Sequence, residues 1–114
     1  MERFLLIVRE DLARIGKLTD EERFENIPMM TEWVNSLAES GNYIGGEPLA
    51  IIGRYVSKDS VLSDGPFIEA KEGVSGYDII LAENLDQAVA IARTCPMVIR
   101  GWAVREVRPM LLPS

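Results

Sequence analysis

One short segment, residues 64–72, gathers acidic, basic and aromatic side chains of the kind that transfer protons or bind ligands. Its Asp64 stands before Gly and Pro, and a carboxylate in a cleft can act as an acid or a base when its pKa is shifted. Asp64 is therefore the candidate catalytic residue, although an Asp before Gly-Pro is also a common turn former. The ligand-binding candidates are Glu47, Asp64, Phe67, Glu69, Lys71, Glu72 and Arg108.

The other candidates each have a structural interpretation beside the functional one. Glu47 follows two glycines, so it either enters a pocket or ends a strand. Arg105 and Arg108 can grip an anionic group with two N–H donors, but salt bridges within or between subunits are the favoured explanation. Cys95 precedes a proline on the inner side of a predicted helix. That position favours a buried structural thiol over a nucleophile, because reactivity needs exposure and a lowered pKa.

Several chemistries are excluded by residue types that the sequence lacks. It contains no histidine, the side chain that most often moves protons near neutral pH, and one cysteine. Zinc sites are built mainly from those two residue types, and no spacing of carboxylates suggests another metal. No G-x-x-x-x-G-K-[ST] stretch is present to cradle a phosphate. We therefore expect neither a metal nor a cofactor.

Charge and cysteine usage limit which partners and which cellular compartment we expect. The formal net charge is -6, from 18 acidic and 12 basic residues, without a basic cluster. Nucleic acids and anionic membranes are bound by clustered Lys and Arg, so we expect neither partner. The lone cysteine fits a reducing compartment, and the N-terminal residues lack the pattern of a secretory signal. We expect a cytoplasmic protein.

The first half of the chain predicts a strand, a loop and a long helix. Residues 4–8 are bulky and apolar, as in a buried strand, and residues 11–18 are mixed and indicate a loop. Thr19 can cap the helix, with Glu22 reaching back to complete a capping box. Pro28 either kinks this helix or divides it in two, and the kink is favoured. The apolar stripe of the helix comprises Phe24, Ile27, Met30, Trp33 or Val34, and Leu37.

The second half predicts a strand, a hairpin, a strand, a helix and a last strand. Gly45 and Gly46 suggest a bulge or a close backbone approach in the first of these strands. Asn84 caps the helix, and Pro96 stops it. The strands are predicted at residues 43–49, 77–82 and 102–108, and the hairpin at 51–56 and 60–63. The inner stripe of the second helix comprises Leu85, Ala88, Val89, Ala92 and Cys95.

Without the hairpin, this order is a split β-α-β unit repeated, which is the ferredoxin-like arrangement β-α-β-β-α-β. We expect a single α+β domain over residues 1–114, with an antiparallel sheet and two helices on one face.

The first strand is apolar on both sides, because Leu5 and Ile7 point away from Phe4, Leu6 and Val8. Burying one apolar side chain stabilises by ~1.5–3 kcal/mol, so the second face needs cover. A homodimer through the open sheet face provides it, and the alternative is that the hairpin folds over that face.

Several motifs in the same order resemble the DGPF/YCII-related family. Residues 64–67 read Asp-Gly-Pro-Phe, and Glu69 and the Lys71-Glu72 pair follow as in the DGPF-x-E-x-KE stretch of the family. Residues 45–49 (GGEPL), 85–88 (LDQA) and 106–109 (EVRP) are similar to its other segments. The resemblance covers nearly the whole chain. It implies a dimeric α/β barrel, in which two ferredoxin-like sheets pack face to face.

The resemblance leaves two functions open. The wider YCII-related group is associated with a His–Asp pair in a cleft, and a chain without histidine cannot use that chemistry. Many DGPF members are linked with extracytoplasmic-function sigma factors. We therefore favour a non-catalytic or accessory dimer that binds a small molecule or a protein and has a regulatory role. The alternative is a small enzyme that performs acid–base chemistry on an organic acid or lactone-like substrate, near the DGPF loop, with Asp64, Glu47 or Lys71.

Overall fold

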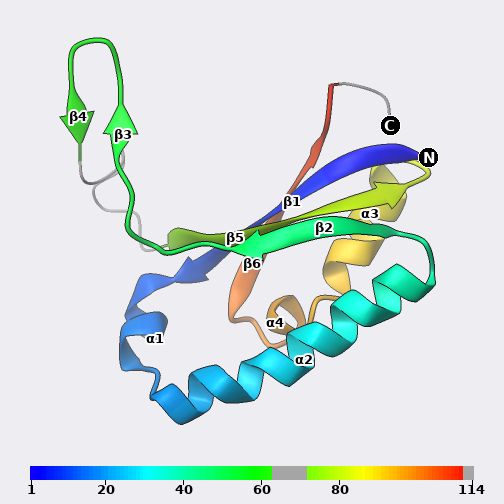
Figure 1. Ribbon diagram of the computed structural model, residues 1–114, viewed down its shortest axis with the longest axis horizontal. Coiled ribbons are helices and arrows are strands. Elements are labelled where there is room, and N and C mark those ends of the chain that lie inside the picture. The colour runs from blue at the N-terminus through cyan, green and yellow to red at the C-terminus, as the bar shows by residue number, and fades with distance from the viewer. Residues whose placement is uncertain (63–71, 112–114) are drawn as a thin grey trace.

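The computed structural model describes residues 1–62 and 72–111, and it confirms an α+β fold with an antiparallel sheet and helices on one face (Figure 1). The main sheet contains β1, β2, β5 and β6, and a hairpin of β3 and β4 stands apart from it. The strands are β1 Glu2–Asp11, β2 Tyr43–Pro48, β3 Tyr55–Val56, β4 Val61–Leu62, β5 Glu72–Ala82 and β6 Ala103–Pro109. The helices are α1 Leu12–Lys17, α2 Asp20–Glu39, α3 Leu85–Arg93 and α4 Pro96–Ile99.

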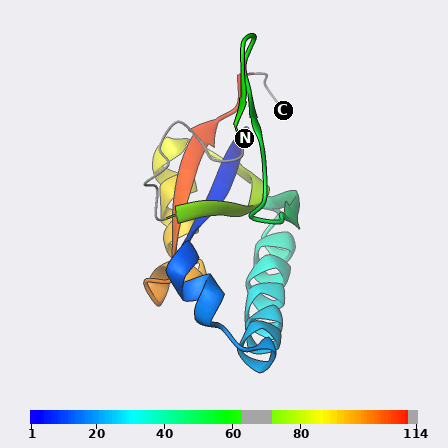
Figure 2. The same cartoon turned by 90° about the vertical axis from the view of Figure 1, so that its left-hand side faces the viewer.

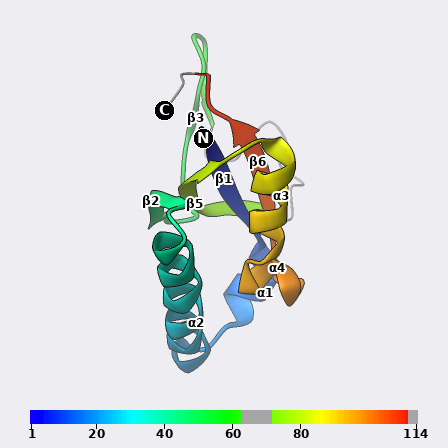
Figure 3. The same ribbon diagram turned by 90° about the vertical axis from the view of Figure 1, so that its right-hand side faces the viewer.

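The main sheet has the strand order β2-β5-β1-β6, and each neighbouring pair is antiparallel. Without the hairpin, this is the predicted ferredoxin-like order, with the first and third strands in the centre. Helix α2 packs against β2, whereas α3 and α4 pack against β6 (Figure 3). Among the described helices, none is long and apolar enough to cross a membrane.

The core lies between the helices and one face of the sheet. Alternate residues of β1 are buried there, while Leu5 and Ile7 on the other face are only partly buried. The buried apolar residues are Phe4, Leu6, Val8, Trp33, Leu37, Ile80, Ala82, Ala88, Ala92, Cys95, Met97 and Ala103. Leu85 and Val89, which were predicted for the inner stripe of the second helix, are instead 46% and 41% exposed.

Helix α2 begins as its sequence predicts. The Thr19 hydroxyl accepts from the Glu22 backbone N–H, and the Glu22 carboxylate accepts from the Thr19 backbone N–H. Pro28 lies inside one continuous helix, so it does not divide the segment in two. Gly41 follows the helix with a φ of +78°, a conformation that glycine adopts at little cost.

Two short helices correct the sequence-based expectations. The loop predicted for residues 11–18 is wrong, because residues 12–17 form α1. The Asp11 carboxylate accepts from the Ala13 and Arg14 backbone N–H groups and so caps this helix. Helix α3 ends before Pro96 as expected, but the same proline starts α4, because proline is well suited to the first helical position.

The hairpin is shorter than predicted and does not cover the open sheet face. Its strands pair only with each other, over residues 55–56 and 61–62. Every residue from 49 to 62 is exposed, including Ile52 at 79% and Val56 at 76%. The hairpin rises from the sheet on the side opposite α2 (Figures 1 and 2). The open face therefore has no cover from the described residues of the same subunit.

Candidate functional site

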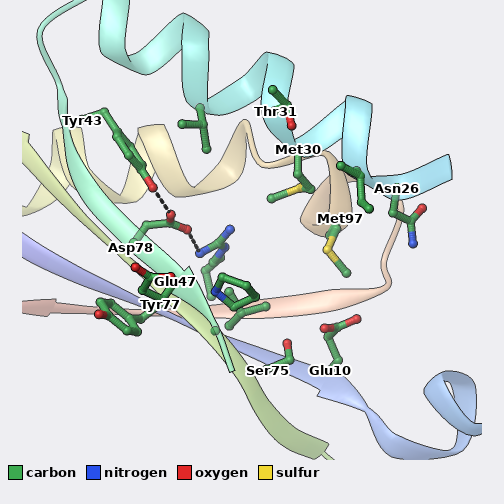
Figure 4. Close-up of a pocket in the computed structure, with 17 residues that line it drawn as sticks. Glu10, Asn26, Met30, Thr31, Tyr43, Glu47, Ser75, Tyr77, Asp78 and Met97 are labelled. Atoms are coloured by element: carbon green, nitrogen blue, oxygen red, sulfur yellow. Dashed lines mark hydrogen bonds and ion pairs between the residues drawn. The ribbon is translucent and has the colours of Figure 1, made fainter. Parts of the chain in front are cut away.

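A cavity of about 450 Å³ lies between the middle of α2 and the sheet (Figure 4). Its helical wall is formed by five residues of α2, which are Asn26, Ile27, Met30, Thr31 and Val34. Residues of β1, β2, β5 and β6, together with Met97 of α4, form the remaining walls. Apolar side chains predominate along the helical wall, as they do in many small-molecule sites.

The first half of the α2 stripe does not pack onto the sheet, and the cavity lies beside the point where packing begins. Trp33 and Leu37 are buried as predicted, whereas Phe24 and Ile27 are 68% and 57% exposed. The expectation of one buried stripe along the whole helix is therefore wrong for its N-terminal part. Periodicity marks the apolar side of a helix, but it does not state how far the sheet extends beneath it.

A buried network of three polar residues forms one end of the cavity (Figure 4). Asp78, on β5, is 8% exposed. Its Oδ2 is 2.6 Å from Nη1 of Arg105 on β6, and its Oδ1 accepts from the Tyr43 hydroxyl of β2 at 2.7 Å. The carboxylate thus receives one charged and one neutral donor, which offsets part of the cost of burying it.

Tyr43 is a neutral hydrogen-bond donor in this network. Burial raises the pKa of the Tyr43 phenol well above its ordinary value, and the hydrogen bond to the Asp78 carboxylate raises it further. A charged phenolate beside that carboxylate would add like-charge repulsion. The phenol therefore keeps its proton throughout the neutral range and can donate it in a hydrogen bond.

Arg105 is held on several sides. Its guanidinium lies 5.0 Å from the centre of the Trp33 ring, and Nη2 donates to the Cys95 sulfur at 3.5 Å. Cys95 is completely buried, in agreement with its interpretation as a structural thiol. The Arg105 Nε is buried and has no hydrogen-bond partner among the described residues. The side chain of this arginine is therefore fixed in place by Asp78, Trp33 and Cys95.

Gly46 makes room for the buried carboxylate. A Cβ on Gly46 would lie 2.4 Å from both Asp78 Oδ1 and the Tyr77 carbonyl oxygen, and 2.8 Å from the Tyr43 hydroxyl. The close backbone approach predicted for the Gly45-Gly46 pair is therefore found at Gly46, whereas a Cβ on Gly45 would meet nothing within 4 Å. The predicted bulge is also present, as a register shift between Tyr43 and Gly45.

A second acidic residue, Glu10, lies at the end of β1 and also lines the cavity. Its side chain is 14% exposed, and Nη1 of Arg14 lies 3.6 Å from its Oε1. Arg14 is stacked on the Trp102 ring, 4.1 Å from its centre. Glu10 and Asp78 thus bring two largely buried carboxylates to one cavity.

Of the predicted ligand-binding residues, the structure places Glu47 at the cavity and Arg108 away from it. Glu47 is exposed on β2, opposite Tyr77. Arg108 is exposed and donates to the Glu106 carboxylate, which also receives a hydrogen bond from Arg9. The hydrogen bond from Arg108 lowers the pKa of Glu106.

The other predicted residues fall in or beside the DGPF segment. Asp64, Phe67, Glu69 and Lys71 lie outside the described residues. Glu72 is the first residue of β5 and pairs with Asp11 of β1.

Sequence reasoning missed the network that the structure brings together. Asp78 was noticeable as the one acidic residue in an otherwise apolar strand. Arg105 was expected to form a salt bridge, and it does so with Asp78. Asp78, Tyr43 and Arg105 come from three strands whose order in the sheet is set by tertiary pairing. A lone acid in an apolar strand is the signal that could have found this site, because a buried charge requires a partner.

The YCII-related domain is the family whose sequence model matches this chain, over residues 3–111. The chain belongs to the YCII-related domain family. An uncharacterised protein of Rhizobium meliloti (strain 1021) is 34% identical over 59 residues, which are 52% of this chain and 48% of that protein. The match thus spans about half the length of this curated relative.

A solved structure supports the fold assignment. The 5-chloro-2-hydroxyhydroquinone dehydrochlorinase TftG from Burkholderia phenoliruptrix AC1100, in complex with 2,5-dihydroxybenzoquinone, is similar with a TM-score of 0.58. The likeness covers 93% of this chain and 90% of TftG, at 16% sequence identity. At that identity the likeness establishes a common fold and nothing about the reaction.

Proposed function

We propose that this YCII-related protein binds a small organic molecule in the cavity beneath α2 and that it does so as a non-catalytic homodimer. The observation that carries the proposal is a cavity of about 450 Å³ that joins an apolar wall to the buried network of Tyr43, Asp78 and Arg105. Small-molecule sites have this composition, with a few convergent polar groups in an apolar surround. The volume also falls within the range of roughly 300–1,000 Å³ of such sites.

The TftG complex is consistent with a ligand of modest size. The compound in that complex is 2,5-dihydroxybenzoquinone, a single ring with oxygen substituents. In the present chain, Met30, Val34 and Met97 would contact a comparable apolar body. The sigma-factor association rests on the family resemblance alone and lies outside the proposal.

The open sheet face supports the homodimer. Leu5 and Ile7 of β1 and Ile79 and Leu81 of β5 are partly exposed on that face. The hairpin of the same subunit does not cover them, although it projects toward that side (Figure 1). Packing two such faces against each other would remove this apolar surface from water.

Binding in the cavity is tested with two tryptophan substitutions on α2. Thr31 lines the cavity, whereas its neighbour Glu32 is exposed and does not belong to the lining residues. Thr31→Trp places an indole at the cavity, and Glu32→Trp adds the same indole elsewhere on the helix. With benzyl alcohol as a neutral probe, titrated by NMR, we expect shifts at Met30 and Val34.

We expect Thr31→Trp to weaken binding of this probe by about tenfold or more, which corresponds to about 1.4 kcal/mol. Glu32→Trp should bind as the unchanged protein does. An equal loss of affinity in both variants, or shifts confined to residues outside the cavity, would rule out this site.

The second candidate function is a small enzyme that performs acid–base chemistry on an organic acid or lactone-like substrate. It is favoured by the hydrogen bond between the Tyr43 hydroxyl and Asp78 inside the cavity, since a carboxylate can accept a proton and a neutral phenol can hydrogen-bond to a substrate. The name of TftG, a dehydrochlorinase, adds a precedent for enzymatic activity on this fold.

Whether this cavity supports enzymatic activity at all is tested with 5-chloro-2-hydroxyhydroquinone, the compound in the name of TftG, as the probe and chloride release as the measurement. If the protein is such an enzyme, the unchanged protein should release chloride faster than buffer alone does. Tyr43→Phe should lose this activity, whereas Arg108→Ala should keep it, because Arg108 lies away from the cavity. Chloride release no faster than in buffer, or equal rates of release from the unchanged protein and both variants, would count against a role of Tyr43 in a reaction of this compound.

A further inference from the structure

The cavity has two largely buried carboxylates, and they differ in how many hydrogen bonds they receive from the described residues. Both oxygens of the Asp78 carboxylate have donors, at 2.6 Å from Arg105 and 2.7 Å from Tyr43. The carboxylate of Glu10 receives no hydrogen bond from any described residue, although its side chain is only 14% exposed. Among the described residues, the buried side-chain atoms that lack a hydrogen-bond partner belong to Arg14 and Arg105. The Glu10 oxygens are not among them, so they stay accessible and can receive a donor from a ligand.

The ion pair with Arg14 does not supply the missing hydrogen bond. Arg14 Nη1 is 3.6 Å from Glu10 Oε1, which is longer than an ordinary hydrogen bond. The same Nη1 is buried without a hydrogen-bond partner in the described part of the chain. Arg14 faces a second cavity, where its guanidinium is stacked on the Trp102 ring at 4.1 Å. Glu10 therefore keeps free acceptor capacity on the side of the first cavity.

The charges around the cavity disfavour an anionic ligand. The acidic lining residues are Glu10, Glu47 and Asp78, and among the described lining residues Arg105 is the one cationic side chain. Arg105 is already paired with Asp78. An entering carboxylate would meet acidic groups without a free cation to receive it, and like charges at close range repel.

A primary amine supplies the hydrogen-bond donors that the Glu10 carboxylate lacks. An ammonium group donates up to three hydrogen bonds, and a hydrogen bond between two charged groups is roughly twice as strong as one between neutral groups. The apolar surface of Met30, Val34 and Met97 lies along the same cavity and suits the carbon body of such a ligand.

On the premise that the cavity binds a small molecule as proposed above, we infer that its ligand is a small apolar amine whose ammonium group hydrogen-bonds to Glu10. This assigns to Glu10 the recognition of the ligand's charge. It also excludes organic acids as the preferred ligand class.

Three compounds of one shape test the inference: benzylamine, benzyl alcohol and benzoate, titrated by NMR at neutral pH and low salt. We expect benzylamine to bind about tenfold more tightly than benzoate, a difference of about 1.4 kcal/mol, with benzyl alcohol between them. Equal binding of all three, or tighter binding of benzoate, would overturn the inference and leave the proposed cavity in place. Failure of all three to bind would remove the proposed function itself.

Glutamine substitutions then locate the effect. Glu10→Gln keeps the size of the side chain and removes its charge, so the preference for benzylamine over benzoate should fall severalfold toward equality. Glu39→Gln makes the same change on the exposed last turn of α2 and should keep the preference. An unchanged preference in a folded Glu10→Gln protein would overturn the role of Glu10. The selectivity of the unchanged protein decides the ligand class even if that variant does not fold.

Discussion

At the scale of single residues, the buried ion pair of Asp78 and Arg105 determines the character of the site. The two side chains are 12% and 2% exposed, and Tyr43 completes the hydrogen bonding of the carboxylate. A buried ion pair adds little net stability compared with apolar packing, but loss of one partner leaves a buried charge uncompensated. The pair is therefore sensitive to single substitutions.

Arg105→Ala should lower the free energy of unfolding by about 3–5 kcal/mol, because it leaves the Asp78 carboxylate buried without its cation. Urea unfolding followed by circular dichroism measures this change. Arg108→Ala is the matched control, since Arg108 lies on the same strand and pairs with Glu106 at the exposed surface. Its effect should be much smaller, and a similar loss in both variants would contradict the importance of burial.

Tyr43 should make stability depend on pH in the alkaline range. Its pKa is raised in the folded protein by burial and by Asp78, whereas an unfolded tyrosine ionises near pH 10. Above about pH 10, unfolding therefore releases a proton, so this contribution is complete below that pH and declines as the pH rises. We expect the free energy of unfolding of Tyr43→Phe to fall less steeply above about pH 10 than that of the unchanged protein. Identical slopes in urea-unfolding series would show that Tyr43 ionises normally.

At the scale of elements, the strand pair β2 and β5 provides the space in which the network forms. Gly46 and Asp78 face each other across this pair, and the backbone at Gly46 passes directly over the carboxylate. The long α2 then closes the cavity from the other side (Figure 4). The site thus depends on two adjacent strands and one helix that is only half packed.

Gly46→Ala should destabilise the fold by about 2 kcal/mol or more, because the added methyl would overlap Asp78 Oδ1 and the Tyr77 carbonyl oxygen. Thermal unfolding measures the effect. Gly45→Ala is the control, since its methyl would meet nothing within 4 Å and Gly45 has no positive φ. Equal stability of the two variants would mean that the close approach at Gly46 relaxes without cost.

At the scale of the whole molecule, the unequal covering of the two sheet faces is the dominant feature. The four helices in the described part of the chain lie on one side or at the end of the sheet, and the hairpin extends on the other side without packing onto it (Figures 1 and 2). A two-stranded hairpin is only marginally stable by itself. A second subunit on the open face would cover the sheet and would also lie beside the hairpin.

Sedimentation should report a dimer at micromolar concentration, and Ile79→Lys should shift it to a monomer by placing a charge on the open face. Ile79 lies on the central strand β5, opposite Leu5. Ile99→Lys adds the same charge on α4, on the helical side, where Ile99 is 70% exposed, and should leave the dimer intact. A monomer in the unchanged protein would refute assembly through this face.

Local patterns in the sequence were sufficient to predict most elements, because capping, periodicity and chain breaks act over a few residues. The Thr19–Glu22 capping box and the Asn84 cap are both found as predicted. Helix α1 was missed because its sequence is short, mixes apolar with polar residues and contains Gly16. The family followed from motifs that are spread along the chain, and the family match over residues 3–111 agrees with it.

The sequence alone thus determined the family, the order of the strands and helices, and the two-sided apolar character of β1, since each is encoded in neighbouring residues. The site was decided by the tertiary structure. Tyr43, Asp78 and Arg105 are 27 to 62 positions apart in the chain, and only the pairing β2-β5-β1-β6 places them around one cavity. The empty space under α2 likewise depends on where the helix leaves the sheet. The periodicity of the helix does not encode the point at which it leaves the sheet, because that point results from packing among segments that are far apart in the sequence.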